Sequence, residues 1–284
     1  MLAAEWHRLR RRPALAIVVV AIVGLTALAY GLGLSSALGS RGLGNVPDEV
    51  MAQRIAPFGF PQSGAAALQN AQLLLVALLA YLSATTVAGD FMLGTIRTSL
   101  LARHDRAGFI LARLAALAAV AFVLCVVVTL LGLILPWVAT LVGADLPAAG
   151  RLEPAAIAAY AAAVLLVGLV VIALASFVAM VTKNAGLPIL FVGVLFFVES
   201  AVASATATLS GPIASVAYYF PLTSVRTLAD RAQLAASDIS LVPGAPGIPS
   251  HAPGVPVLAL VGMAWIVLAC VANVWFLRRA DIDA

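Results

Sequence analysis

Apolar and polar residues alternate along this chain in long blocks rather than residue by residue. Six blocks are apolar over about 18 residues or more, and an α helix of that length crosses a hydrocarbon core of about 30 Å. The pattern predicts an all-α polytopic membrane protein with a single transmembrane domain over residues 1–284. The six expected spans are Ala14–Leu34, Ala71–Ala88, Leu114–Leu135, a stretch within Ala155–Val181, a stretch from Leu187 past Glu199, and Val257–Leu277.

The composition agrees with this pattern. Mean hydropathy is +1.11, with 63% hydrophobic and only 10% charged residues, whereas a soluble domain is about half apolar and a quarter charged. The first block, Ala14–Leu34, is longer than the core of a usual signal peptide, so we expect it to be retained as a span. Cys125 and Cys270 each stand alone inside an apolar block, without metal-like spacing, and are expected to pack.

The basic residues predict the orientation. If both termini lie on one side of the membrane, that side holds eleven of the sixteen Lys and Arg residues and the other side holds five. The positive-inside rule then places both termini in the cytoplasm. The net charge of +4 does not favour nucleic-acid binding, because the basic residues lie between apolar blocks, where topology signals belong.

Two segments outside the spans have an amphipathic pattern. Residues 1–13 are expected to form an interfacial N-terminal helix that anchors the chain to inner-leaflet lipid. This anchor either acts alone or also contacts a cytoplasmic partner. Pro13 suits the first turn of the span that follows. The anchor residues are Trp6, Arg8, Arg10, Arg11 and Arg12.

The second amphipathic segment lies between the fifth and sixth spans, in residues 211–256. We expect an outer interfacial helix there, followed by the proline-rich loop PGAPGIPSHAPGVP, which cannot be a regular helix. The apolar positions of the helix recur at helical spacing and are Leu222, Val225, Leu228, Ala229 and Ala232.

Motifs for catalysis are missing from the sequence. A phosphate-binding P-loop needs a lysine in GxxxxGK[ST], and the one lysine, Lys183, stands in TKNAG. No zinc pattern surrounds His7, His104 or His251, and no GxSxG elbow occurs. A hydrolytic or metal enzyme is therefore disfavoured, and no metal or cofactor is expected in this chain.

Glu199 is the clear charge inside an expected span. It lies about 18 Å along the helix from Leu187, past the middle of the core. Because a carboxylate in hydrocarbon is costly, it should face the bundle interior, a water path or a partner. The other interpretation, that it meets water near the end of its span, is favoured. Tyr81 and Thr85 are candidates for a polar seam in the second span, although helix ends are commonly polar.

The most distinctive segment is residues 90–108, which begin DFMLGTIRTSLLARHD. An aspartate suits the positive N-terminal end of a helix, so Asp90 is expected to begin one. An apolar stripe then predicts an amphipathic helix on the inner interface or on a soluble partner. Gly94 disfavours helix by about 1 kcal/mol, but it permits close approach of another backbone. The stripe consists of Leu93, Ile96, Leu100 and Leu101, with Arg97, Arg103 and Arg106 mostly off it.

This segment resembles the cytoplasmic segment of type-2 class ATP-binding-cassette (ABC) transporter permeases. The start EWHRLRRRP, the close VWFLRRADIDA and the segment YYFPLTSV are also similar to that family. Asp90 stands where glutamate is common, and His104-Asp105 where a proline is often found. The matching residues are Asp90, Gly94, Thr95, Ile96, Arg97, Leu100, Leu101 and Arg106, with Arg113 at the basic position that begins the next span.

The resemblance implies a dimer of six-span permeases, homomeric or heteromeric, in the cell (inner or plasma) membrane of a prokaryote. Each permease would contact a separate P-loop ATPase subunit that holds ATP and Mg, so this chain would not be an enzyme by itself. Residues 90–108 would be the coupling helix, with Asp90, Gly94, Thr95, Arg97, Leu100, Leu101 and Arg106 at the ATPase interface. Such a permease would export an apolar or amphipathic substrate.

Two alternatives remain open at this point. An ion-gradient-driven secondary transporter would use Glu199. A membrane anchor or assembly protein without transport would hold a stable partner on the outer segment Leu222–Pro256.

Overall fold

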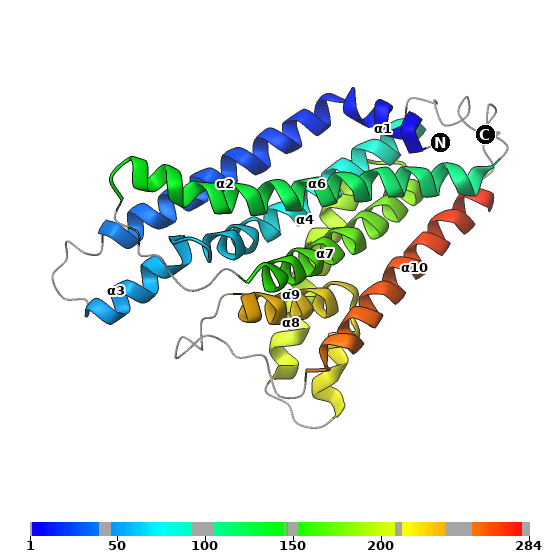
Figure 1. The fold of residues 1–284 in the computed structure, drawn as a ribbon. Helices are drawn as coiled ribbons and strands as arrows, with labels where there is room; N and C mark the ends of the chain where they lie inside the picture. The colour runs from blue at the N-terminus through cyan, green and yellow to red at the C-terminus, as the bar shows by residue number, and fades with distance from the viewer. Residues whose placement is uncertain are drawn as a thin grey trace.

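The computed structural model describes residues 2–39, 47–92, 105–144, 146, 153–207, 212–236 and 252–279. These residues form helices and no strand (Figure 1). The α helices are α1 (Leu2–Arg10), α2 (Pro13–Gly39), α3 (Asp48–Ile55), α4 (Ser63–Met92), α6 (Arg106–Leu141), α7 (Pro154–Thr182), α8 (Gly186–Ala207), α9 (Pro221–Ala236) and α10 (Val255–Arg279). Two 3₁₀ helices, η2 (Ala56–Phe58) and η3 (Pro212–Tyr219), complete the set.

The prediction of six spans is confirmed, because six of these helices are long and apolar enough to cross a membrane. They are α2, α4, α6, α7, α8 and α10. Two of them begin earlier than the hydropathy pattern predicts. α4 starts at Ser63, since small buried residues there already pack against α6. α6 starts at Arg106, since the Asp105 side chain accepts a hydrogen bond from the Gly108 N–H at 2.9 Å and caps the helix.

The centre of the bundle consists of α4 and α7, which pack against each other. In each of them 61% of the most apolar part is buried, against 22% in α2 and 17% in α8 and in α10. The outer helices therefore leave large apolar side chains exposed, as helices that face lipid do.

Small residues set how closely the helices approach. At Gly132 of α6, a Cβ atom would lie 2.5 Å from the Cβ of Ala67 and 2.7 Å from the carbonyl oxygen of Ser63, both in α4. At Gly262 of α10, it would lie 2.5 Å from a methyl group of Val225 in α9. Close backbone contact at small residues is the usual way in which membrane helices associate.

α9 has the apolar face that the sequence predicts, and this face is packed inside the bundle. Leu222, Val225, Leu228 and Ala229 are buried, and α9 contacts α7 and α10. The position of α9 at an outer membrane interface stays a prediction. Most of the proline-rich loop lies outside the described residues, but its last two residues, Val255 and Pro256, already belong to α10.

α1, the beginning of α6 and the end of α10 lie at one end of the bundle. Arg106 at the start of α6 donates to the carbonyl oxygens of Leu277 and Arg278 at 3.4 and 3.5 Å. α3 lies at the opposite end (Figure 1). As predicted, residues 2–10 are helical, and Pro13 begins the first span.

Candidate functional site

Asp90 is the centre of a buried cluster of charges. The expectation that Asp90 begins a helix is wrong, because α4 continues through it to Met92 and places it in the last turn. Asp90 is 0% exposed. A carboxylate is unfavourable near the negative C-terminal end of a helix and costly to bury, so it needs cationic partners.

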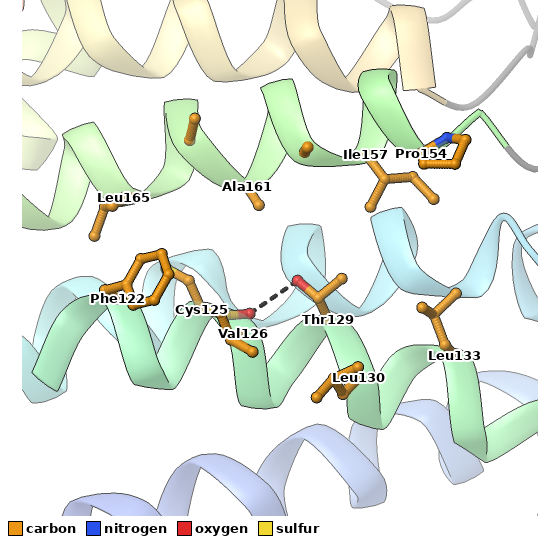
Figure 2. Close-up of a pocket in the computed structure, with 12 residues that line it drawn as sticks. Phe122, Cys125, Val126, Thr129, Leu130, Leu133, Pro154, Ile157, Ala161 and Leu165 are labelled. Atoms are coloured by element: carbon orange, nitrogen blue, oxygen red, sulfur yellow. Dashed lines mark hydrogen bonds between the residues drawn. The ribbon is translucent and has the colours of Figure 1, made fainter. Parts of the chain in front are cut away.

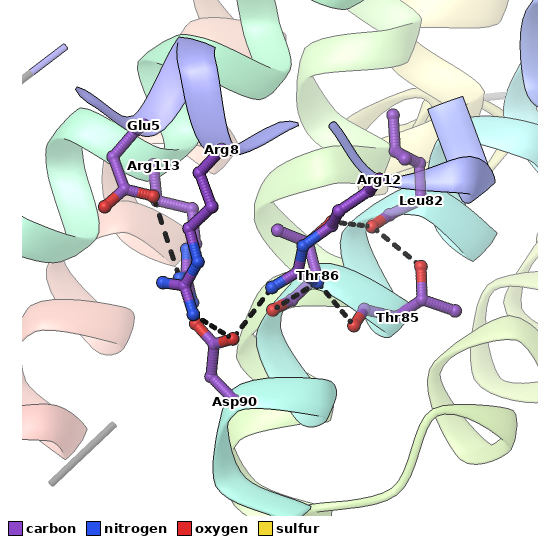
Figure 3. A network of polar contacts seen from close by, with 8 residues as sticks. All are labelled: Glu5, Arg8, Arg12, Leu82, Thr85, Thr86, Asp90 and Arg113. Atoms are coloured by element: carbon purple, nitrogen blue, oxygen red, sulfur yellow. Dashed lines mark hydrogen bonds and ion pairs between the residues drawn. The ribbon is translucent and has the colours of Figure 1, made fainter. Parts of the chain in front are cut away.

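Three arginines supply that charge (Figure 3). The Oδ1 atom of Asp90 accepts hydrogen bonds from Arg8 at 2.9 Å and from Arg12 at 2.8 Å. Its Oδ2 atom accepts from Arg113 of α6. One carboxylate thus joins α1, the turn before α2, the end of α4 and the first part of α6.

A second carboxylate completes the cluster. Glu5 of α1 is 5% exposed and lies 3.7 Å from the guanidinium of Arg113. The Arg113 guanidinium also lies 4.8 Å from the ring centre of Phe109. Arg12 donates to the carbonyl oxygen of Thr85 at 3.2 Å. We define the Asp90 cluster as Glu5, Arg8, Arg12, Asp90 and Arg113, which together contain two carboxylates and three guanidinium groups.

The Asp90 cluster contains residues to which the sequence assigned two different roles, and it includes only some of the expected lipid anchors. Arg8 and Arg12, expected as lipid anchors, bind Asp90, expected as a coupling residue. Trp6, Arg10 and Arg11 are exposed instead.

Glu5 and Arg113 each belong to a motif of the sequence, but neither motif predicts an ion partner for them. A signal for one face did exist, because Glu5, Arg8 and Arg12 recur at spacings of three and four residues. No comparable signal pointed from Asp90 to Arg113.

The other expected coupling residues fall into two groups. Gly94, Thr95, Arg97, Leu100 and Leu101 lie outside the described residues, as does the helix expected there. Arg106 is described, and its guanidinium contacts the carbonyl end of α10, a position that suits a cation.

Glu199 forms a second polar centre within the spans. It is 3% exposed, so the interpretation that it meets water at the end of its span is wrong. Its Oε2 atom accepts the backbone N–H groups of Leu222 and Thr223, at 2.9 and 2.6 Å, and the Thr223 hydroxyl at 3.0 Å. These groups belong to the first turn of α9, where backbone N–H groups lack helical partners and attract a carboxylate.

Arg226 of α9 strengthens the same junction. It donates to the hydroxyl of Ser200 at 2.8 Å, and its guanidinium lies 4.1 Å from the ring centre of Phe196. Burial lowers the pKa of the Arg226 guanidinium, while the carboxylates of Asp230 and Glu199 oppose this shift. The α8–α9 junction therefore has one anionic and one cationic contact.

The two candidates for a polar seam belong to α4. The Thr85 hydroxyl donates to the carbonyl oxygens of Tyr81 and Leu82, at 2.8 and 3.2 Å. Its hydrogen bonds are therefore made to the backbone of α4 itself. The Thr85 carbonyl binds Arg12. Thr85 therefore belongs with the Asp90 cluster by its contacts, whereas Glu199 belongs with α9.

A cavity of about 420 Å³ lies between α6 and α7 (Figure 2). Phe122 and Leu130 of α6 and Ile157 and Leu165 of α7 are among the side chains that line it. Thr129 also lines the cavity, but its hydroxyl already donates a hydrogen bond to the carbonyl oxygen of Cys125 at 2.8 Å. The cavity can therefore accept hydrocarbon but offers little to a polar ligand.

The described part of the chain brings together no group of three or more His, Cys, Asp and Glu residues that could hold a metal ion. The charged centres at Asp90 and Glu199 join separate helices of the bundle through their hydrogen bonds. No protein-family model matches the chain, and no curated protein matches it.

Proposed function

We propose that this chain is the permease subunit of an ATP-driven ABC transporter that exports an apolar or amphipathic substrate. ATP and Mg would be bound by a separate P-loop ATPase chain, and a second permease subunit would complete the pore. The protein would lie in the cell membrane of a prokaryote with both termini in the cytoplasm. The observation that carries the proposal is the Asp90 cluster, which ties together the two spans that flank the segment resembling a coupling helix.

The contacts of the Asp90 cluster support a physical route for this coupling. Residues 93–104 connect the end of α4 to the start of α6, and Asp90 and Arg113 join these two helices. Removing one partner of a buried ion pair costs several kcal/mol, so the pair resists separation of the helices. A partner that pushes on residues 93–104 would therefore move α4 and α6 together, and α1 with them through Arg8 and Glu5.

The substrate class rests on the cavity between α6 and α7. Its lining is almost wholly apolar, and several of its side chains, such as Phe122 and Leu130, are exposed on the outside of the bundle. A molecule with a hydrocarbon chain could enter such a cavity from the bilayer without losing its apolar surroundings. A strongly polar cargo would find no hydrogen-bonding partners there.

Reconstitution with an ATPase tests the proposal. The chain is co-expressed with a candidate P-loop ATPase chain, and ATP hydrolysis is measured in proteoliposomes with and without the permease. We expect stimulated hydrolysis, which Arg97→Ala and Leu100→Ala lower while the complex still assembles. Arg54→Gln, on the exposed side of α3 at the other end of the bundle, is the matched control. Robust transport by the purified chain alone would overturn the proposal.

Glu199 distinguishes this proposal from a secondary transporter. Under our proposal, an ion gradient without ATP drives no uptake, and Glu199→Gln acts only through the stability of the α8–α9 junction. Uptake that is driven by a gradient, needs no ATP and is lost in Glu199→Gln would favour the secondary transporter instead.

A further inference from the structure

The N-terminal helix has one side that packs and one side that is free. Glu5 and Leu9 of α1 are buried, at 5% and 2% exposure, and face the bundle. Trp6 is 39% exposed, and Arg10 is exposed on the same short helix. Arg11, in the turn before α2, is also exposed.

The four N-terminal arginines divide in the same way. Arg8 and Arg12 bind Asp90, so their charge is compensated within the fold. Arg10 and Arg11 have no acidic partner in the part of the chain that the structure describes. Both side chains are exposed.

The end of α10 repeats this arrangement. Trp275 is 52% exposed, and the guanidinium of Arg279 lies 4.4 Å from the centre of its ring. Arg278 is exposed beside it. This end of α10 lies at the same end of the bundle as α1, as the contact of Arg106 with Leu277 requires. We define the tryptophan–arginine belt as Trp6, Arg10, Arg11, Trp275, Arg278 and Arg279.

Exposed apolar residues of the spans lie next to both parts of the belt along the chain. Ile17 and Val20 of α2 are 58% and 71% exposed and follow Arg11 by two turns or so. Leu268 and Val271 of α10, each 61% exposed, precede Arg278 by a similar distance. Each part of the belt thus has cationic groups at the end of a span and apolar surface just inside it.

We propose that the tryptophan–arginine belt binds the headgroups of anionic phospholipids. One guanidinium group can donate two parallel hydrogen bonds to the oxygens of a phosphate. Tryptophan rings suit the boundary between headgroups and acyl chains. The adjoining apolar surface would contact the acyl chains of the same lipids, which a free phosphate ion does not have. The proposal depends on the chain spanning a membrane and is independent of the transporter function.

Lipid retention in native mass spectrometry tests this proposal. The purified protein is equilibrated in detergent with equal amounts of phosphatidylglycerol and phosphatidylcholine that have the same acyl chains. We expect the protein to retain phosphatidylglycerol in preference to phosphatidylcholine. The ratio of the two retained lipids should fall about fivefold for each belt arginine replaced by glutamine. The variants are Arg10→Gln/Arg11→Gln and Arg278→Gln/Arg279→Gln.

Three controls make the result specific. Arg54→Gln removes an exposed arginine at the opposite end and should leave retention unchanged. Arg10→Lys/Arg11→Lys keeps the charge and should retain most of the preference, which separates lipid binding from misfolding. Added inorganic phosphate should not displace the lipid.

Several outcomes would overturn the proposal. One is unchanged phosphatidylglycerol retention in both double glutamine variants. Another is an equal loss in Arg54→Gln, or displacement of the lipid by inorganic phosphate. A third is a change from dimer to monomer with lipid retention intact, which would assign the belt to contact with a second copy of the chain.

Discussion

Replacing Asp90 by asparagine keeps the shape of the side chain but removes the charge that three arginines share. The Asp90 cluster then contains three guanidinium groups and a single carboxylate, that of Glu5. We expect the helices that meet at this cluster to be held together less strongly, and the free energy of unfolding to fall.

Burial determines the size of this effect. The side chains of Arg8 and Arg12 are 32% and 22% exposed. Water therefore screens their ion pairs with Asp90, and the loss of each pair lowers the free energy of unfolding only a little. The side chain of Arg113 is 1% exposed, and removing one partner of such a buried pair costs about 3–5 kcal/mol. Glu5, 3.7 Å from Arg113, retains part of the compensation. We therefore expect a loss at the lower end, about 3 kcal/mol.

A double-mutant cycle with Arg113→Met isolates this pair. The double variant removes one anionic and one cationic group, so the cluster keeps the net charge of the wild type. Since an apolar replacement of a buried ion pair is often nearly neutral, the double variant should recover about 2 kcal/mol relative to Asp90→Asn. The assay is unfolding by sodium dodecyl sulfate from mild-detergent micelles, followed by tryptophan fluorescence. Additive losses in the cycle, or wild-type stability in Asp90→Asn, would refute the reasoning.

The same assay checks three further predictions. Glu199→Ala leaves buried N–H groups of α9 without their acceptor and should cost about 2–3 kcal/mol, whereas Thr223→Ala removes one hydroxyl contact and should cost about 1 kcal/mol; equal losses would contradict this difference. Gly132→Val should destabilise the contact between α4 and α6 by several kcal/mol, while the same change at Gly24, which has no atom within 4 Å of the added carbon, serves as control. Asn273→Leu removes the side-chain bond of 3.1 Å that joins α10 to a carbonyl of α7, so it should cost about 1 kcal/mol, and a stabilised protein would show that this bond does not hold the helices together.

The sequence predicted the helices well because membrane insertion depends on local composition. A block of apolar residues must satisfy its own backbone hydrogen bonds, and a helix does this without reference to the rest of the chain. The positions of Leu222, Val225 and Leu228 on one face of α9 followed from the helical period in the same way. The starts of α4 and α6 were missed because polar caps and small residues extend a helix beyond its apolar block.

The partners of the charged residues could not be predicted in this way. The sequence favoured contact of Glu199 with water at the end of its span, because the N–H groups that shield it lie 23 and 24 residues further along the chain. Asp90 was assigned to the start of a helix because an aspartate suits the positive N-terminal end of a helix. Its partners Arg8 and Arg113 are 82 and 23 residues away. Patterns among neighbouring residues do not predict contacts at such separations.

The sequence by itself thus determined that this chain forms six helices long and apolar enough to cross a membrane. The tertiary structure alone decided which N-terminal arginines bind a carboxylate within the fold and which side chains remain exposed. The physical reason is that hydrophobic length is a property of each segment, whereas the neutralisation of a buried charge requires a particular partner from another helix. Arg8 and Arg12 found that partner in Asp90, whereas Arg10 and Arg11, in the same run of sequence, bind no carboxylate of the residues that the structure describes.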